Sequence, residues 1–415
     1  MMYDSPERAR EFGLPADHTL GPVAPGERLV ALDVLRGWTM FGVLWSNLVD
    51  WYGTTGPSTS VDRALAFAQD WLVEGHFYTL LSILFGIGFA IQLQRAGEKD
   101  ASGVATYYRR LAVLFGLGLV HAFMLWPGDI LKMYAIAGCA LLLFRAMPAR
   151  RLPWAALGVW ILIPFMFSRA RMLAGYTELI PWTQVPAQDW MLAHGSWLQI
   201  QHIRADFVME HTGRFALAMF FPDMLMLMLL GLWAFRSGFM KRATEETSGP
   251  ARLLVFSIVA VAAGFAGAYA LSELRPSGGA QGAAWTELRF WIPRQRLMQL
   301  PEEVALLGAT LAYAAIILLV WRTSWGARRL AALAATGRMA LTTYLTQSVV
   351  CTLLFYGYGL GWYGRVGYRG MLGIALVVFA AQMAVSVWWL RRYRYGPVEW
   401  LWRSLTYGRV LPRRV

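Results

Sequence analysis

Cysteine and charge are both scarce in this chain of 415 residues. Its two cysteines, Cys139 and Cys351, lie far apart inside apolar segments. That spacing provides neither a disulfide framework nor the paired ligands of a metal site, so we expect no bound metal. Charged residues make up 15% of the chain and hydrophobic residues 57%. A soluble protein of this length carries more charge, so the composition favours a membrane protein.

About ten long apolar segments account for most of the sequence. A stretch near 20 residues spans the roughly 30 Å hydrocarbon core as a helix, and only helices satisfy every backbone amide there. The sequence therefore predicts an all-α fold, a polytopic transmembrane helical bundle of about ten spans. The expected spans are Leu29–Val49, Trp71–Gln94, Leu111–Trp126, Ile130–Phe144, Leu152–Phe167, Phe215–Phe235, Leu253–Leu271, Val304–Trp321, Leu330–Tyr356 and Met371–Leu390.

A secretory signal and a linker are also missing. The first apolar segment contains Asp33 and Arg36, so it lacks the clean apolar core of a signal peptide and should remain as the first membrane helix. No long Pro/Ser-rich stretch separates the spans, which predicts one domain. Its expected parts are a cytoplasmic N-terminal arm at 1–28, the bundle at 29–390 with an outer amphipathic segment near 187–212, and a basic, aromatic cytoplasmic tail at 391–415.

The formal net charge is +13, but the basic residues are scattered between apolar segments rather than gathered on one soluble domain. We therefore expect no nucleic-acid partner. The basic clusters fall in alternate connections, and the positive-inside rule then places both termini in the cytoplasm. Arg289, Arg294 and Arg296 are expected in a long outer connection, where arginines count less in that rule.

Three polar residues are expected on one face of the first span. An ionisable side chain inside a membrane is costly unless it is paired or hydrated. Asp33 and Arg36 lie one helical turn apart, which allows an ion pair, and at about 100° per residue Asn47 falls near Arg36 around the helix. This stripe should face the bundle interior. It is either functional or a structural ion pair that fixes helix packing.

His121 lies in the third span, and a tight turn with proline and glycine, Trp126–Asp129, follows it. Imidazole is the side chain best suited to move a proton near neutral pH, and an adjacent carboxylate can orient it and raise its basicity. With Asp129 nearby, His121 is the first candidate for a general base. His76, at the start of the second span, is the alternative. Either histidine can equally be a satisfied packing residue.

Six blocks of sequence, in this order and over nearly the whole chain, resemble the signature blocks of the YeiB-like family of bacterial inner-membrane proteins. That family is in turn distantly similar to the membrane acyltransferases that include heparan-alpha-glucosaminide N-acetyltransferase, which also opens with a Leu-Arg-Gly helix ending in an Asn. The resemblance implies a multi-pass protein of the bacterial inner membrane. The blocks are Leu32–Gly37, Leu84–Gly88, His121 with Gly128–Ile130, Gly337–Thr342, Cys351–Phe355 and Tyr395–Arg403.

The more distant similarity implies transfer of an acyl group from cytoplasmic acyl-CoA to an extracytoplasmic hydroxyl or amine, with acetyl as the first candidate for that group. Asn47 matches the functional Asn of the superfamily. The catalytic His of the lysosomal enzyme follows shortly after that Asn, whereas no His lies between Asn47 and His76 here. His121, oriented by Asp129, is the favoured replacement. Arg36, paired with Asp33, and Arg338 are the candidates to hold the phosphates of CoA. The alternative for each is a side chain that extends to the lipid headgroups, and for Arg338 that alternative is favoured.

Two other classes of function stay open. A transporter or lipid translocase would use His121 and Asp129 as a buried proton relay, although no internal repeat supports it. A non-catalytic membrane scaffold would use every buried charge structurally. Expected partners are membrane lipids and an acceptor that is a glycan, a lipid or a small molecule; association as a homo-oligomer stays open.

Overall fold

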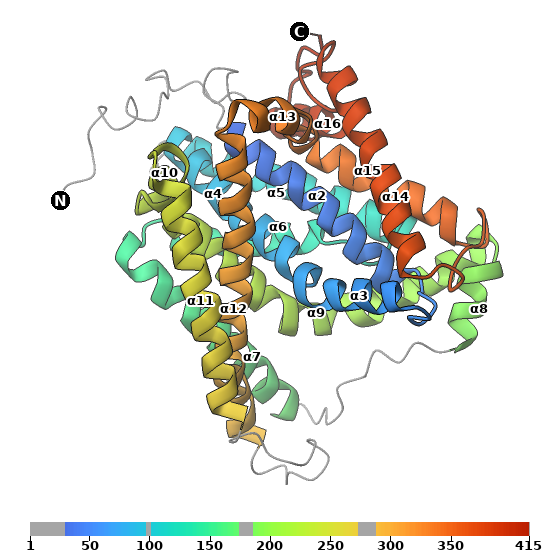
Figure 1. Ribbon diagram of the computed structural model, residues 1–415, viewed down its shortest axis with the longest axis horizontal. Coiled ribbons are helices and arrows are strands. Elements are labelled where there is room, and N and C mark those ends of the chain that lie inside the picture. Colours follow the sequence, from blue (N-terminus) through green and yellow to red (C-terminus); the bar gives the residue numbers. More distant parts are fainter. Residues whose placement is uncertain (1–29, 97–100, 174–185, 273–287, 415) are drawn as a thin grey trace.

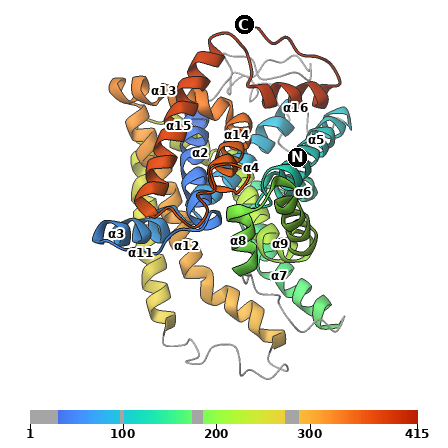
Figure 2. The same ribbon diagram turned by 90° about the vertical axis from the view of Figure 1, so that its right-hand side faces the viewer.

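The computed structural model describes residues 30–96, 101–173, 186–272 and 288–414. These residues form helices joined by short connections, with two isolated β-bridges and no strand among them, so the all-α expectation is confirmed. The longer helices pack side by side, and α13 and α16 lie across one end of the bundle (Figures 1 and 2). The α-helices are α2 (Val30–Trp51), α3 (Ser60–Ala68), α4 (His76–Ala96), α5 (Ala101–Met124), α6 (Leu131–Leu141), α7 (Leu152–Leu173), α8 (Pro186–His194), α9 (Trp197–Arg236), α10 (Phe239–Glu245), α11 (Gly249–Ser272), α12 (Leu288–Trp321), α13 (Ser324–Arg338), α14 (Ala340–Phe355), α15 (Tyr368–Leu390) and α16 (Pro397–Tyr407).

Several helices are suited to a bilayer. In the described chain, four helical segments are long and apolar enough to cross a membrane, and a fifth is formed if the helices Phe220–Arg236 and Phe239–Glu245, bent by 70°, are counted as one span. The expectation of about ten spans and cytoplasmic termini stays a prediction. The four segments are Ser60–Gln94, Gly249–Leu271, Arg296–Trp321 and Tyr368–Leu390.

The outer surface of α11 and α15 is apolar. Val255, Ile258 and Val259 on α11, and Leu376 and Val377 on α15, are each more than half exposed. In water such surfaces would be unfavourable, whereas in a bilayer lipid tails cover them at no cost. These two helices therefore supply the clearest lipid-facing surface of the described chain.

The interior is built around α2, whose Val34, Leu44 and Leu48 are almost fully buried. Glycine allows its closest contact: a Cβ on Gly37 would come within 2.0 Å of the carbonyl oxygen of Leu333 on α13. The reverse contact places Gly337 of α13 against the carbonyl of Asp33. Small residues let helix backbones approach in this way. The contact fixes α13 across the start of α2.

One expected span is wrong. The sequence predicts a single helix over Leu330–Tyr356, but α13 ends at Arg338 and α14 begins at Ala340, with Met339 at φ −109° and ψ 27° between them. The break has a physical cause: the backbone N–H of Thr342, in the first turn of α14, donates to the buried carboxylate of Glu399 at 2.9 Å. A carboxylate at a helix N-terminus satisfies its free N–H groups and interacts favourably with the helix dipole.

Arg296 is also misplaced by the sequence. We expected it in an outer connection, but it lies in α12, is 7% exposed and pairs with Asp223 of α9 at 2.9 Å. The expected amphipathic segment near 187–212 is divided between α8 and α9, and α9 continues from Trp197 through the next expected span to Arg236. Ile200 on this segment is fully buried, so this face of α9 packs against the interior. The expected N-terminal arm, 1–28, lies outside the described residues.

Candidate functional site

Four of the six sequence blocks meet at one end of the bundle, which we call the basic end: the starts of α2 and α14, the last turn of α13, and α16 (Figure 2). The block Leu32–Gly37 contacts Gly337, and Gly337–Thr342 bonds to Glu399 in Tyr395–Arg403. The fourth block, Leu84–Gly88, joins them because a Cβ on Gly88 would lie 3.8 Å from Nη2 of Arg36. Segments far apart in sequence thus build one site.

Four arginines gather at the basic end. Arg36 Nη1 donates to Oδ1 of Asp33 at 2.9 Å, so the expected ion pair is present. Arg110 of α5 interacts electrostatically with Arg36 and with Arg403 of α16. Arg338 of α13 interacts with both Arg403 and Asp33. We call Arg36, Arg110, Arg338 and Arg403 the arginine cluster; with Asp33 included, its net charge is positive.

Arg110 carries the clearest sign of this crowding. Its Nη1 donates to Oε1 of Gln92 at 3.0 Å, and its guanidinium stacks 4.2 Å from the ring centroid of Trp402. Burial, and next the repulsion from Arg403, lower the pKa of Arg110 to about 10. A buried cation beside other cations is stabilised by an anion. This end of the bundle is therefore chemically suited to bind phosphate.

Glu399 holds the basic end together. Besides the bond from the Thr342 N–H, its carboxylate accepts the hydroxyl of Thr342, and that hydroxyl oxygen accepts the N–H of Val398 at 3.1 Å. Glu399 itself is buried in α16. Since its bonds join α16 to α14, Glu399 positions Arg403 relative to Arg338.

We expect Glu399→Ala to lower the free energy of unfolding by about 1–3 kcal/mol, because the Thr342 donors lose a charged acceptor. The change should appear as a lower Tm of the detergent-purified protein and as faster hydrogen exchange over 397–407. The matched control is Glu246→Ala, which removes an exposed carboxylate that pairs with Arg252 at the surface. An equal Tm for Glu399→Ala and the control would contradict this role.

The second part of the candidate site is the pair His121 and Asp129. Nδ1 of His121 lies 2.7 Å from Oδ2 of Asp129, and the two side chains are 1% and 0% exposed. The turn after α5 brings them together, because Asp129 Oδ1 accepts the backbone N–H of Lys132 in the first turn of α6 at 3.0 Å. Asp129 therefore caps α6 with one oxygen and orients His121 with the other.

The second ring nitrogen of His121 is unoccupied. Nε2 is buried and has no hydrogen-bond partner in the part of the chain that the structure describes. The rings of Tyr344 and Trp126 pack beside the imidazole, with centroids at 5.1 and 6.2 Å. Because the carboxylate accepts the proton on Nδ1, Nε2 is left with a lone pair that can accept another proton. This is the arrangement that a general base requires.

Asn47 lies on the same side of α2 as the contacts to this pair. It precedes Trp51 by one helical turn, and Trp51 packs against Trp126 with a centroid distance of 5.1 Å. Trp126 in turn contacts His121. Asn47 is half-buried and shows no hydrogen bond among the described contacts. Its place is compatible with a role beside His121, and that role stays a prediction.

His76 lies in a different part of the bundle. Its Nε2 is 3.1 Å from the carbonyl of Trp71, and its Nδ1 is 3.2 Å from the hydroxyl of Thr310 on α12. Its ring also packs edge-on against Tyr313. With both nitrogens engaged, His76 is held as a packing residue would be, which favours His121 over His76 as the base.

Arg204 is a residue that the sequence analysis missed. It is 1% exposed, and it donates to the carbonyl of Met124 at 3.0 Å and to the hydroxyl of Tyr358 at 2.9 Å. Met124 ends α5, one turn after His121. The missed signal is its place in the apolar stripe of α9, four residues after the buried Ile200. A charged residue on the buried, apolar face of a helix indicates that its side chain is paired in the interior.

A third cluster lies between α9 and α12. Arg296 bonds to Asp223 and stacks 5.1 Å from the ring centroid of Trp160, and Glu303 interacts electrostatically with both charges. No local pattern in the sequence indicates this cluster, since Asp223 and Arg296 are 73 residues apart. It contains two carboxylates and one cation within helices suited to a membrane.

Comparisons with known proteins agree with the sequence blocks. A family model described as a protein of unknown function (DUF418) matches residues 234–409. The uncharacterized protein YxaH of Bacillus subtilis (strain 168) is 33% identical, covering 94% of this chain and 96% of its own length. The uncharacterized 39.9 kDa protein in the amylase 3' region of Bacillus acidopullulyticus is 27% identical, covering 95% of this chain and 98% of its own. The uncharacterized protein YeiB of Escherichia coli (strain K12) is 28% identical, covering 92% of this chain and 96% of its own length.

The resemblance to YeiB-like proteins is thereby confirmed. The family model ends just beyond α16 and includes the break between α13 and α14. With 33% identity to a relative over nearly its whole length, the chain belongs to the YeiB-like family of DUF418 proteins.

Proposed function

We propose that this protein is a membrane acyltransferase that moves an acyl group from acyl-CoA to a hydroxyl or amine. Acetyl is the first candidate for that group. The observation that carries the proposal is the buried His121 whose Nδ1 is held by Asp129 and whose Nε2 is unoccupied. The acceptor would be an extracytoplasmic glycan, lipid or small molecule, and the protein would lie in the bacterial inner membrane.

In the proposed reaction, Nε2 of His121 removes the proton from the acceptor as its oxygen or nitrogen attacks the thioester carbonyl. Asp129 keeps the proton of the neutral ring on Nδ1 and stabilises the imidazolium that forms. The amide of Asn47 would donate to the oxyanion of the tetrahedral intermediate. Collapse breaks the carbon–sulfur bond, and the thiolate of CoA takes the proton from Nε2, which returns His121 to its neutral form.

The arginine cluster supports a donor site at the basic end. Arg110 and His121 both lie on α5, and eleven residues at the usual rise separate them by roughly 16 Å. This separation is comparable to the reach of the pantetheine arm of CoA. Phosphates held by Arg36, Arg110 and Arg338 would leave the thioester near His121, while Asp33 keeps Arg36 in place.

Calorimetry with the detergent-purified protein tests the donor site directly. We expect CoA and acetyl-CoA to bind wild type saturably, and Arg36→Ala and Arg110→Ala each to weaken binding by about 10- to 100-fold, because each removes a charge-assisted contact to phosphate. His121→Ala should retain binding. The control is Arg252→Ala, an exposed arginine on α11. Absence of binding to every CoA species would overturn the acyltransferase proposal.

A proton-coupled transporter is the second candidate, and the Asp223, Arg296 and Glu303 cluster favours it. Ionisable groups that are buried between membrane helices mark ion pathways in transporters. In that case proteoliposomes containing the protein should carry a proton current when a substrate mixture is supplied, and Glu303→Gln should abolish it. A protein that binds acetyl-CoA and carries no such current is not a transporter of this kind.

A further inference from the structure

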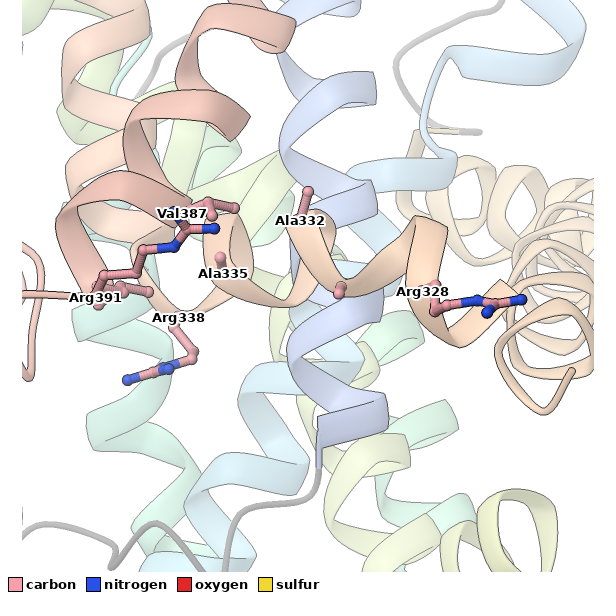
Figure 3. A pocket seen from close by; sticks show the side chains of 8 residues that line it. Arg328, Ala332, Ala335, Arg338, Val387 and Arg391 are labelled. Atoms are coloured by element: carbon pink, nitrogen blue, oxygen red, sulfur yellow. The ribbon is translucent and has the colours of Figure 1, made fainter. Parts of the chain in front are cut away.

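A groove runs between α13 and the last turns of α15, on the face of α13 that points away from α2 (Figure 3). Its cavity volume is about 410 Å³. Small side chains of α13 form its floor, and Arg391 extends over it toward Val387, whereas Arg328 lies at the other end of the groove and points away from Arg391. The lining residues are Arg328, Ala331, Ala332, Ala335, Arg338, Val387, Leu390 and Arg391.

The charge around this groove is of one sign. Three of its eight lining residues are arginines and none is acidic. Neither α13 nor α15 contains an aspartate or glutamate anywhere along its length. The remaining lining, alanine, valine and leucine, is apolar. The groove therefore presents cations beside a hydrocarbon surface, which is complementary to an amphiphile with a negative head.

The position of the groove matches the surface of a bilayer. The apolar segment Tyr368–Leu390 is long enough to cross a membrane, and it ends inside the groove at Leu390. Val385 and Trp388, on the last turns of α15, are each at least half exposed. Tryptophan at the end of an apolar helix is typical of the level of the lipid headgroups. Lipid is therefore the medium that this groove meets.

We propose that the groove between α13 and α15 is a binding site for one anionic phospholipid. The guanidinium group of Arg391 holds the headgroup phosphate, Arg328 adds positive charge at the other end of the groove, and an acyl chain lies along Val387, Leu390 and the alanines. Arginine suits this role because its planar fork donates two hydrogen bonds to a phosphate. A zwitterionic lipid binds less well, since its own cation is repelled by the arginines around the groove. The proposal does not rest on acyl transfer, although Arg338 lines this groove and is also assigned to the donor site.

Native mass spectrometry and thermal unfolding of the detergent-purified protein test this site. The variant is Arg328→Gln/Arg391→Gln, which leaves Arg338 and the arginine cluster intact. The matched control is Arg329→Gln/Arg392→Gln, which removes the same charge from adjacent positions, where the guanidinium groups stack on Trp325 and Trp388. The probes are phosphatidylglycerol, phosphatidylcholine and glycerol 3-phosphate.

We expect wild type and the control to retain one phosphatidylglycerol and to gain Tm on its addition. The groove variant should bind it about 30-fold more weakly, because each arginine near an anionic headgroup contributes to the attraction. Ala335→Phe, which fills the groove without changing the charge, should weaken the binding of phosphatidylglycerol in the same way.

Three results would overturn the proposal. An equal loss of phosphatidylglycerol binding in the groove variant and the control would mean that general surface charge attracts the lipid. Binding of phosphatidylcholine as tight as that of phosphatidylglycerol would mean that the site does not distinguish the two headgroups. Binding of glycerol 3-phosphate as tight as that of phosphatidylglycerol would mean that the groove takes a free phosphate ester and that its apolar wall has no role.

Discussion

Replacement of His121 by asparagine is expected to slow acyl transfer by about 100- to 10,000-fold, the range contributed by a positioned general base. The asparagine amide can still donate to Asp129 from the position of Nδ1, so the buried carboxylate keeps a partner. What is lost is Nε2, the atom that accepts the proton. Activity can be followed as release of free CoA thiol from acetyl-CoA by membrane vesicles that contain the protein.

Asp129→Asn provides the companion variant. Its amide can still cap α6, but it no longer fixes the proton of His121 on Nδ1, so we expect a loss of about 100-fold or more. Both variants should bind acetyl-CoA as wild type does and should unfold within a few degrees of it. If instead both variants lower the Tm strongly while the folded fraction keeps full activity, the pair is structural. That result would support the hypothesis of a non-catalytic membrane scaffold.

The second large effect concerns stability. Arg296→Met should lower the free energy of unfolding by about 3 kcal/mol or more, because Asp223 then stays between helices without its cation and beside Glu303. Methionine keeps the length of the side chain and much of its packing against Trp160, so the loss reports mainly on charge.

The double variant Arg296→Met/Asp223→Leu is the control for this effect. Removing both charges of a buried pair is often neutral, whereas removing one leaves an uncompensated charge. We therefore expect the double variant to recover most of the Tm that the single variant loses. Additive losses from the two single changes would show that Arg296 and Asp223 act independently, and the 2.9 Å contact would then contribute little.

The sequence was most informative where partners are close along the chain. His121 and Asp129 are eight residues apart, and the intervening turn has proline and glycine to reverse the chain, so their contact was expected and is present. The ion pair of Asp33 and Arg36 follows in the same way from one helical turn. In both cases local backbone geometry alone brings the side chains together.

The sequence was least informative where a polar contact interrupts an apolar pattern. The apolar content of Leu330–Tyr356 predicts one span, and nothing local shows that Glu399, 57 residues after Thr342, caps a new helix there. The sequence placed Arg296 in a connection for the same reason, because a hydropathy pattern assigns an arginine to a loop rather than to a span. Its partner on α9 makes burial favourable, and that partner becomes visible only in three dimensions.

The pattern of apolar segments was enough to predict an all-helical protein with helices suited to a membrane, because backbone amides in lipid must be satisfied within each segment. It also determined the family through blocks of residues. Three features became visible only in three dimensions: four of those blocks meet, Arg110 and Arg403 join Arg36, and α13 and α15 enclose a basic groove. These depend on which helices pack together, and such packing is fixed by contacts between residues that are distant in the chain.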